Sequence, residues 1–252
     1  ITQAVHTAMG ISVMAGGAVG AFGMCSARML LNLTGTPDDV MDQAVIYLTI
    51  YFAGMPAAMI YNFGAAILRA VGDTRRPLYY LSISGAVNVL LNLFTVIVLD
   101  MGAAGVGLAT AVSQVISAVL VVVCLCRSHG PIQLRFRDIH IHKEKLFEIA
   151  KVGLPAGVQS TIFSISNVVI QSSINSFGSI TMAGNAAGSN LDSFVNTATN
   201  AVCQAALSFA GQNMGAKKYR RVGKVVMQCS LLVLLIGLLL GFGMIALGRP
   251  LL

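Results

Sequence analysis

Asp192 is the single charged residue between Lys151 and Lys217, in a stretch that is otherwise apolar or neutral. It belongs to the segment GSNLDSFVNTATN, residues 188–200. Apolar surroundings favour the protonated form of a carboxyl group, so Asp192 could exchange a proton near neutral pH. It could equally bind Na⁺ or an organic cation. Because an isolated charge in such surroundings is costly, we interpret Asp192 as a residue for cation coupling or substrate binding rather than a structural one.

Polar side chains recur around Asp192 with the period of a helix, in steps of 4, 3, 4 and 3 residues: Asn185, Ser189, Asp192, Asn196 and Thr199. The preceding segment carries a second stripe, in steps of 4, 3 and 4: Ser160, Ser164, Asn167 and Gln171. Such stripes fit either hydrogen bonding between helices or the walls of a polar cavity. Hydrogen bonding explains the amides and hydroxyls, but it explains the carboxylate poorly. We therefore predict a site for a substrate or ion made of Gln159, Ser164, Asn167, Gln171, Asn185, Asp192 and Asn196.

The elements that position these residues follow from composition. Hydrophobic residues make up 56% of the 252 residues and charged residues 10%, against about 25% charged in soluble domains. The mean hydropathy is +0.80. Several apolar runs exceed the roughly 20 residues that cross a bilayer as a helix. We predict an all-α, polytopic membrane protein with seven spans at about 4–31, 41–68, 77–99, 103–126, 149–176, 181–210 and 222–247.

Basic residues predict the orientation of the spans. Fourteen of the sixteen Lys and Arg residues lie in three connections, 69–76, 127–151 and 217–224, which alternate with acidic or neutral ones. Basic connections face the cytoplasm, so the net charge of +7 reflects topology in a multi-pass protein of the plasma membrane. The basic clusters lack interleaved aromatic residues and flank spans, which argues against nucleic acid as a partner.

The longest connection mixes apolar and charged residues, as in LRFRDIHIHKEKLFEIAK. This pattern fits a helix on the membrane surface and fits a solvated linker equally well. We divide the chain into four spans at 1–126, a basic cytoplasmic linker at 127–148 and three spans at 149–252. Cys124, Cys126 and the nearby histidines match no standard zinc spacing, so we expect no metal site.

An internal similarity suggests two repeats. FGMCSARMLL at 22–31 and FGMIALGRPLL at 242–252 share Phe-Gly-Met and a following Arg with Leu-Leu, and six spans separate the two points. We expect two six-span repeats of the same orientation in a protein of about twelve spans, of which this chain is a fragment holding seven.

Glycine and proline predict local features of the spans. GxxxG spacing favours close helix contact at Gly16/Gly20 and at Gly237/Gly241. We expect Pro56 to mark a bend that lines a cavity and Pro155 to lie in the first turn of a helix. For the polar residues of the third and fourth spans, Asn88, Asn92 and Gln114, packing is the expected role.

Enzyme motifs are missing from the sequence, which has no HExxH, no GxSxG and no phosphate-binding GxxxxGK[ST] loop. We therefore expect neither an enzyme nor a bound cofactor. Any transport by this chain would draw on an ion gradient, H⁺ or Na⁺, or on a separate subunit.

Three motifs resemble the multidrug and toxic compound extrusion (MATE) family. AAILRAVGDTRRPLYYLSISGAVNVLLNLFTVI at 65–97 is similar to that family's fourth-to-fifth-span region, with its L-R-x-x-G-D-T-x-x-P signature. KVGLPAGVQSTIFSISNVVIQSSINSFG at 151–178 resembles the seventh span, which opens with Gly-Leu-Pro. AGQNMGAKKYRRVGKVV at 210–226 resembles the G-Q-x-x-G-A element after the eighth span.

The resemblance implies a helical bundle in which this chain runs from the third to the ninth of twelve spans. It implies export of drugs and other organic cations against H⁺ or Na⁺ by alternating access, in a protein that is monomeric at full length. The seventh span here lacks the acid that some members carry, and Asp192 stands in the eighth. Two alternatives remain open: a flippase for lipids or lipid-linked sugars, which would need basic residues within the spans, and a membrane fragment that does not transport.

Overall fold

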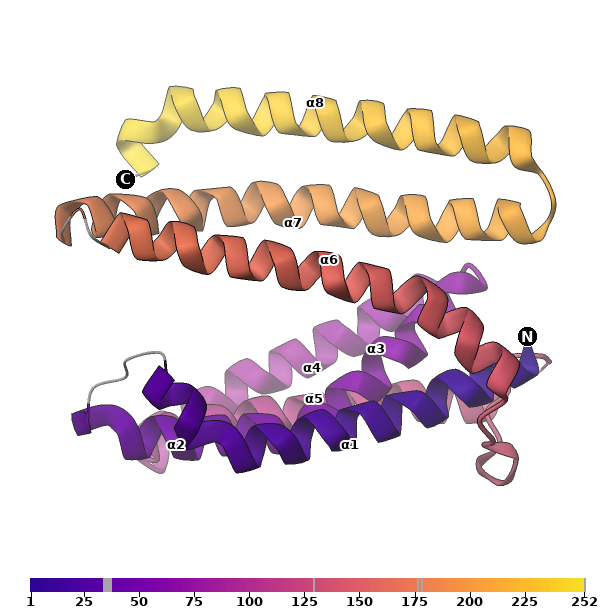
Figure 1. Cartoon of the computed structure of the whole chain (residues 1–252), viewed down its shortest axis with the longest axis horizontal. Coiled ribbons are helices and arrows are strands. Elements are labelled where there is room, and N and C mark those ends of the chain that lie inside the picture. Colours follow the sequence, from indigo (N-terminus) through magenta and orange to yellow (C-terminus); the bar gives the residue numbers. More distant parts are fainter. Residues whose placement is uncertain (34–37, 129, 176, 178, 252) are drawn as a thin grey trace. The chain divides into compact units, whose positions relative to one another are not determined.

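The computed structural model describes the backbone of residues 1–33, 38–128, 130–175, 177 and 179–251. These residues form helices joined by short connections, and the described part of the chain contains no strand. The helices are α1 (Thr2–Leu33), α2 (Asp38–Ala53), α3 (Met55–Ala70), α4 (Arg75–Leu93), α5 (Gly102–Arg127), α6 (Lys143–Asn175), α7 (Ser179–Gly215) and α8 (Tyr219–Leu251) (Figure 1). A π-helical turn at Phe94–Val98 extends α4, and a short 3₁₀ helix spans Phe136–Asp138. The all-α fold is confirmed.

Each predicted span corresponds to a helix or to a bent helix pair. Five helices are long and apolar enough to cross a membrane, and α2 with α3 adds a sixth span bent by 40°. Among the described residues, α7 does not reach the same apolarity, although its 37 residues are ample in length. The polar stripe around Asp192 is the reason, because its amides and hydroxyls lower the mean hydropathy of the helix.

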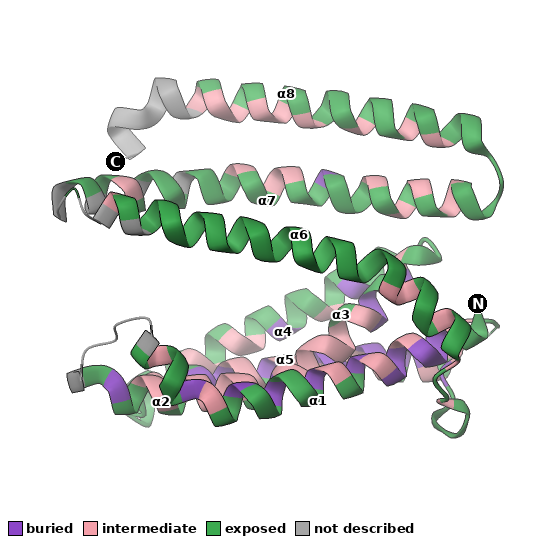
Figure 2. Cartoon of the chain, viewed as in Figure 1, coloured by how far each residue is buried: buried purple, intermediate pink, exposed green. Residues whose placement is uncertain are grey.

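The chain divides into two compact units, Ile1–Ala150 and Lys151–Leu252. In the first unit α5 packs against α2, α3 and α4, while α1 packs against α2 and α3. Buried side chains concentrate on the inward faces of α1, α3 and α5 (Figure 2). The core cluster joins residues of these three helices to one residue of the following connection: Val5, Met9, Leu68, Val121, Cys124, Leu125 and Leu134.

The bend between α2 and α3 is confirmed, and small residues on α1 accommodate it. Gly54 ends α2, and Pro56 lies in the first turn of α3. A Cβ atom on Gly16 would lie 2.6 Å from the Cα atom of Pro56, and one on Gly20 would lie 2.8 Å from the carbonyl oxygen of Phe52. The predicted close contact at Gly16/Gly20 is therefore present, and Pro56 packs against α1 at this contact.

The turn between α3 and α4 explains the GDTRRP sequence. Gly72 has φ of +92°, a left-handed conformation that glycine adopts without strain. The backbone N–H of Asp73 donates to the carbonyl of Leu68 at 3.0 Å, which closes the end of α3. The Asp73 carboxylate in turn accepts the backbone N–H of Arg76 at 3.1 Å and so caps α4.

The connection after α5 is a loop, rather than a surface helix, up to Lys143. Residues 130–142 form a loop with one 3₁₀ turn, and the helix begins only at Lys143. Leu134 is 3% exposed in the core, and its backbone N–H donates to the carbonyl of Leu125 at 3.1 Å. A surface helix was wrong for residues 134–142 because Leu134 is buried in the bundle rather than facing lipid.

Hydrogen bonds to α1 hold the same loop. His6 is 2% exposed, with Nδ1 2.8 Å from the carbonyl of Thr2. Its Nε2 accepts the backbone N–H of Arg135 at 3.2 Å, and the hydroxyl of Thr7 accepts the backbone N–H of His142 at 3.2 Å. Because a carbonyl oxygen only accepts, Nδ1 is the donor to Thr2 and Nε2 is the acceptor from Arg135. The loop is thus bound to α1 at two buried polar side chains.

The second unit contains α7 and α8, which pack against each other as an antiparallel pair (Figure 1). Two predictions for this unit were wrong. Pro155 lies inside α6 rather than in its first turn, because the helix begins twelve residues earlier at Lys143. A Cβ atom on Gly237 or Gly241 would meet no atom of the described residues within 4 Å, so GxxxG spacing marks no close contact in that part of the chain. The similarity at 242–252 falls mainly on side chains outside those that the structure describes.

Candidate functional site

The polar stripe of α7 is present on one continuous helix, with Asp192 at its middle. The side-chain amide of Asn196 donates to Asp192 Oδ2 at 2.8 Å and to the Asp192 carbonyl at 3.1 Å. Both side chains are exposed in this chain. No Lys, Arg or His among the described residues forms an ion pair with Asp192. A neutral amide therefore orients the carboxyl group, and no ion pair to a described residue occupies it.

A side-chain hydrogen bond between described residues joins the stripes of α6 and α7. The side-chain amide of Asn185 donates to Gln171 Oε1 at 3.3 Å, close to the connection between the two helices. Asn185 and Asp192 are seven residues apart, so about 10 Å of helix separates them on the same face. Away from this connection α6 does not pack along α7 within the part of the chain that is described. The structure thus brings the two stripes together at one end.

Three predicted site residues lie on α6 without such a link to α7. Ser164 and Asn167 are exposed, and they have no side-chain hydrogen bond to α7 among the described residues. Gln159 lines a cavity of about 540 Å³ along α6, where the other lining residues are Leu154, Pro155, Val158, Ile162 and Phe163. The face that carries these residues is exposed throughout (Figure 2). In a bilayer it needs water or further protein to cover its amides.

A polar network lies between α4 and α5 in the first unit. Ser84 of α4 donates to the carbonyl of Ser113 of α5, and Asn88 donates to the Ser113 hydroxyl at 3.3 Å. Asn92 donates to Asn88 Oδ1 at 3.0 Å. These bonds support the packing role expected for the asparagines. The spacing of 88 and 92 was the available signal, but nothing in the sequence pointed to the serines.

Two amide oxygens near this network have no partner among the described residues. They are Asn92 Oδ1 and Gln114 Oε1, and both atoms are buried. Buried acceptors without a donor are uncommon in native structures. Gln114 packs where α5 meets the bend, since a Cβ atom on Gly54 would lie 2.5 Å from its Oε1. The interior of the first unit therefore contains two acceptor oxygens to which a water molecule could donate a hydrogen bond.

The chemistry that these groups allow is binding rather than catalysis. The described residues contain no cluster of three or more His, Cys, Asp or Glu residues placed to hold a metal ion. Asp192 can accept a proton or a cation, and the neighbouring amides can donate to or accept from a polar ligand. The α6 residues lie on a helix that is long and apolar enough to span a bilayer, and Asp192 lies on α7, whose 37 residues are ample in length.

Comparison with known proteins identifies the family. The MatE family model matches residues 1–94 and 155–252. Among curated relatives, the probable multidrug resistance protein YpnP of Bacillus subtilis (strain 168) is 32% identical over 203 residues, which cover 81% of this chain and 45% of that protein. The probable multidrug resistance protein YoeA of the same organism is 27% identical, over 88% of this chain and 50% of that protein. The chain spans about half the length of these relatives.

Solved structures share the fold. The outward-facing conformation of a multidrug resistance MATE family transporter is similar with a TM-score of 0.90 and 19% identity, over 99% of this chain and 56% of that one. The Vibrio cholerae MATE transporter VcmN in the bent form gives a TM-score of 0.81 and 20% identity, over 99% and 59%. The family consists of multi-pass proteins of the cell membrane that transport and do not catalyse reactions. The matched model, the relatives and the shared fold together show that this chain belongs to the multidrug and toxic compound extrusion (MATE) family.

Proposed function

We propose that this protein is a secondary transporter, coupled to H⁺ or Na⁺, that exports drugs or other organic compounds, mainly cations. The observation that carries the proposal is Asp192, a carboxylate on a span-length helix with no ion pair among the described residues. The names of the relatives, two of them probable multidrug resistance proteins, support the substrate class.

A single carboxylate provides a simple coupling device. Asp192 can be neutralised by a proton or Na⁺ or by a cationic substrate, but two cations repel each other at one carboxylate. Entry of the coupling ion therefore favours release of the substrate, and entry of the substrate favours release of the ion. Exchange of this kind uses the ion gradient without a cofactor or nucleotide.

The amide side chains orient the Asp192 carboxylate and allow the site to accept different substrates. Asn196 fixes the carboxylate through the 2.8 Å hydrogen bond. Gln171 and Asn185 form a link between α6 and α7 through their side-chain amides. Ser164, Asn167 and Gln159 extend the polar face along α6. Amides and hydroxyls can serve as donor or acceptor, so such a face suits chemically diverse substrates.

Alternating access needs two bodies that can move against each other. The compact units Ile1–Ala150 and Lys151–Leu252 supply two such bodies. In the proposed cycle, ion and substrate occupy Asp192 in turn while the units expose it first to one side of the membrane and then to the other. The basic connections keep their expected cytoplasmic orientation throughout.

Efflux from liposomes tests the proposal. The full-length protein is reconstituted, the liposomes are loaded with a fluorescent organic cation, and a pH gradient or a Na⁺ gradient is imposed. We expect efflux that depends on one of the two gradients and stops when that gradient is collapsed. Absence of efflux under both gradients, together with movement of a labelled phospholipid between leaflets, would instead favour the flippase. Absence of both activities would favour a membrane protein that does not transport.

A further inference from the structure

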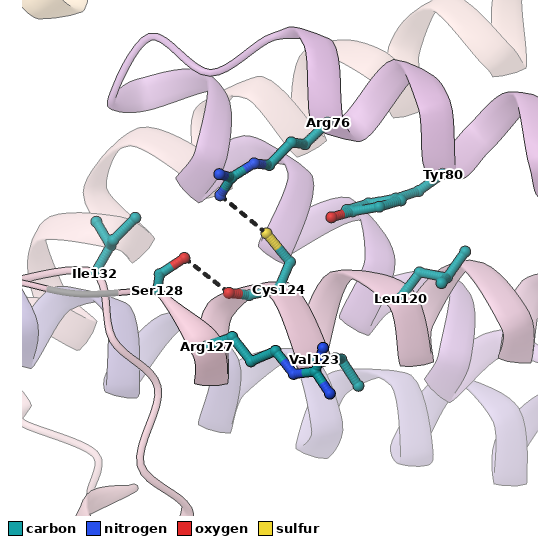
Figure 3. Close-up of a pocket in the computed structure, with 8 residues that line it drawn as sticks. All are labelled: Arg76, Tyr80, Leu120, Val123, Cys124, Arg127, Ser128 and Ile132. Atoms are coloured by element: carbon teal, nitrogen blue, oxygen red, sulfur yellow. Dashed lines mark hydrogen bonds between the residues drawn. The ribbon is translucent and has the colours of Figure 1, made fainter.

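A second cavity lies in the first unit, apart from the polar stripes of α6 and α7. It has a volume of about 470 Å³. Three segments line it: the start of α4, the last two turns of α5 and the loop that follows (Figure 3). The lining residues are Arg76, Tyr80, Leu120, Val123, Cys124, Arg127, Ser128 and Ile132.

The charge of this cavity is positive. Its lining holds two guanidinium groups, Arg76 and Arg127, and no carboxylate. Arg76 Nε forms an ion pair with Asp73 Oδ2 at 3.2 Å. Arg127 has no ion pair or side-chain hydrogen bond to any residue that the structure describes. One guanidinium charge in the cavity therefore lacks a compensating anion.

The geometry of Arg76 also leaves donors available. Its Nη1 points across the cavity to the sulfur of Cys124 at 3.6 Å (Figure 3). A thiol sulfur is a weak acceptor, so this contact satisfies the guanidinium poorly. A phosphate oxygen in the cavity would be a stronger partner, because it is a better acceptor than a thiol sulfur and carries the opposite charge.

The rest of the lining is mostly apolar. Leu120, Val123 and Ile132 are the apolar lining residues, and Tyr80 directs its hydroxyl toward Arg76 and Cys124 (Figure 3). Ser128 already donates its hydroxyl to the carbonyl of Cys124 at 2.7 Å, so it adds no free donor. A ligand that fits this lining carries an anionic group next to an apolar part.

The position of the cavity matches that chemistry. Arg76 and Arg127 lie at the ends of the apolar spans Arg75–Val98 and Gly102–Arg127. Large apolar side chains on these helices, including Leu78 and Val119, are exposed where lipid chains would meet them. The arginines therefore lie at the depth of lipid headgroups, on the side that carries the basic connections. Basic pockets between spans at that depth bind anionic lipid headgroups.

We propose that this cavity binds the phosphate of an anionic phospholipid from the cytoplasmic leaflet. Arg76 and Arg127 contact the phosphate, while Leu120, Val123 and Ile132 contact the apolar part of the same lipid. The site lies entirely within the first unit and does not depend on transport or on Asp192. Its occupant would bridge α4, α5 and the loop after α5.

Native mass spectrometry of the full chain in detergent tests the proposal. The probes are phosphatidylglycerol and phosphatidylcholine with the same acyl chains, titrated separately. We expect at least one phosphatidylglycerol to stay bound under conditions that remove phosphatidylcholine. Arg127→Gln should weaken that binding about tenfold, the loss of one charge-assisted contact. Arg127→Lys should lose less, because it keeps the charge but not the planar fork.

Arg137→Gln is the matched control, because Arg137 is exposed in the same connection, carries the same charge and does not line the cavity. It should bind phosphatidylglycerol as the parent does. Equal binding of the two lipids by the parent would overturn the proposal, as would equal losses in Arg127→Gln and Arg137→Gln. Displacement of the lipid by millimolar inorganic phosphate would also overturn it, since the site would then take a soluble anion. The comparison of the two lipids and the displacement by phosphate both use the parent chain, so their outcome does not depend on whether a variant folds.

Discussion

The side chains of Asn185 and Gln171 make the hydrogen bond that ties α6 to α7, at 3.3 Å. We predict that a double-mutant cycle with Asn185→Ala and Gln171→Ala gives a coupling energy of about 0.6 kcal/mol, the average for such bonds in membrane proteins. The free energy of unfolding is measured by denaturant titration in detergent micelles for the parent, the two single variants and the double variant.

Ser189 provides the control for that cycle, because it lies on the same stripe and is exposed, and because the hydrogen bond described for Gln171 goes to Asn185. Pairing Ser189→Ala with Gln171→Ala should give a coupling energy within error of zero. A coupling of zero for Asn185 as well would show that the two helices do not meet at this point in the folded protein.

Residue identity also decided how far the site could be predicted. The spacing around Asp192 correctly predicted a polar stripe on one helix, because helical period depends on sequence alone. The contact between Asn196 and Asp192 was predictable for the same reason, since Asn196 is four residues further along that helix. The buried amide oxygens of Asn92 and Gln114, which have no partner among the described residues, could not be predicted, because burial depends on which helices surround a side chain.

At the scale of helices, the contact between α1 and α3 depends on glycine. A Cβ atom on Gly16 would lie 2.6 Å from the backbone of Pro56, whereas one on Gly17 would meet nothing within 4 Å. We predict that Gly16→Ala lowers the free energy of unfolding by about 1–3 kcal/mol through overpacking. Gly17→Ala should leave it unchanged or raise it by up to about 1 kcal/mol, because alanine is the better helix former.

Denaturant unfolding of Gly16→Ala and Gly17→Ala in parallel measures the difference in their free energies of unfolding. The comparison is direct because the two positions are adjacent on α1. Similar stabilities for Gly16→Ala and Gly17→Ala would contradict the close contact between α1 and the bend.

The loop after α5 yields a second prediction at this scale. Leu134 is 3% exposed, whereas Phe136 is 68% exposed. We predict that Leu134→Ala weakens the docking of the loop by about 2–5 kcal/mol, the cost of truncating a buried leucine. Trypsin should then cleave faster after Arg135 and Arg137, with the rate followed by mass spectrometry of the fragments.

Phe136→Ala is the matched control, because it lies between the two cleavage sites and packs against little. Cleavage should proceed at the parent rate in this variant. A similar increase in both variants would mean that Leu134 does not hold the loop on α1 and α5.

These elements also show where sequence patterns stop. Span positions follow from apolar run length, so the helices matched their predicted ranges closely. The docking of the loop on α1 could not be predicted in this way. Leu134 and His6 are 128 residues apart, and only the folded bundle brings their segments together. The same limit explains Gly237 and Gly241, whose spacing permits a close contact but cannot supply a neighbouring helix.

At the scale of the whole molecule, the chain combines two compact units with different interiors. The first has a buried core and a polar network between α4 and α5, whereas α6 of the second exposes a polar face along its length. Family membership was predictable from the motifs at 65–97, 151–178 and 210–226, of which the first contains the turn between α3 and α4 and the third the turn between α7 and α8. The predicted division at 127–148 remains a prediction, as does the monomeric state.

The central claim is that Asp192 carries the coupling ion or the cationic substrate, and one comparison tests it most directly. Efflux of a fluorescent cation from liposomes is measured under the effective gradient for the parent, for Asp192→Asn and for Ser193→Ala. The account predicts that Asp192→Asn lowers the rate by about tenfold or more, since one charge contact is lost, while Ser193→Ala transports like the parent. Efflux by Asp192→Asn at the parent rate at every pH would contradict the account and leave Asp192 with a structural role.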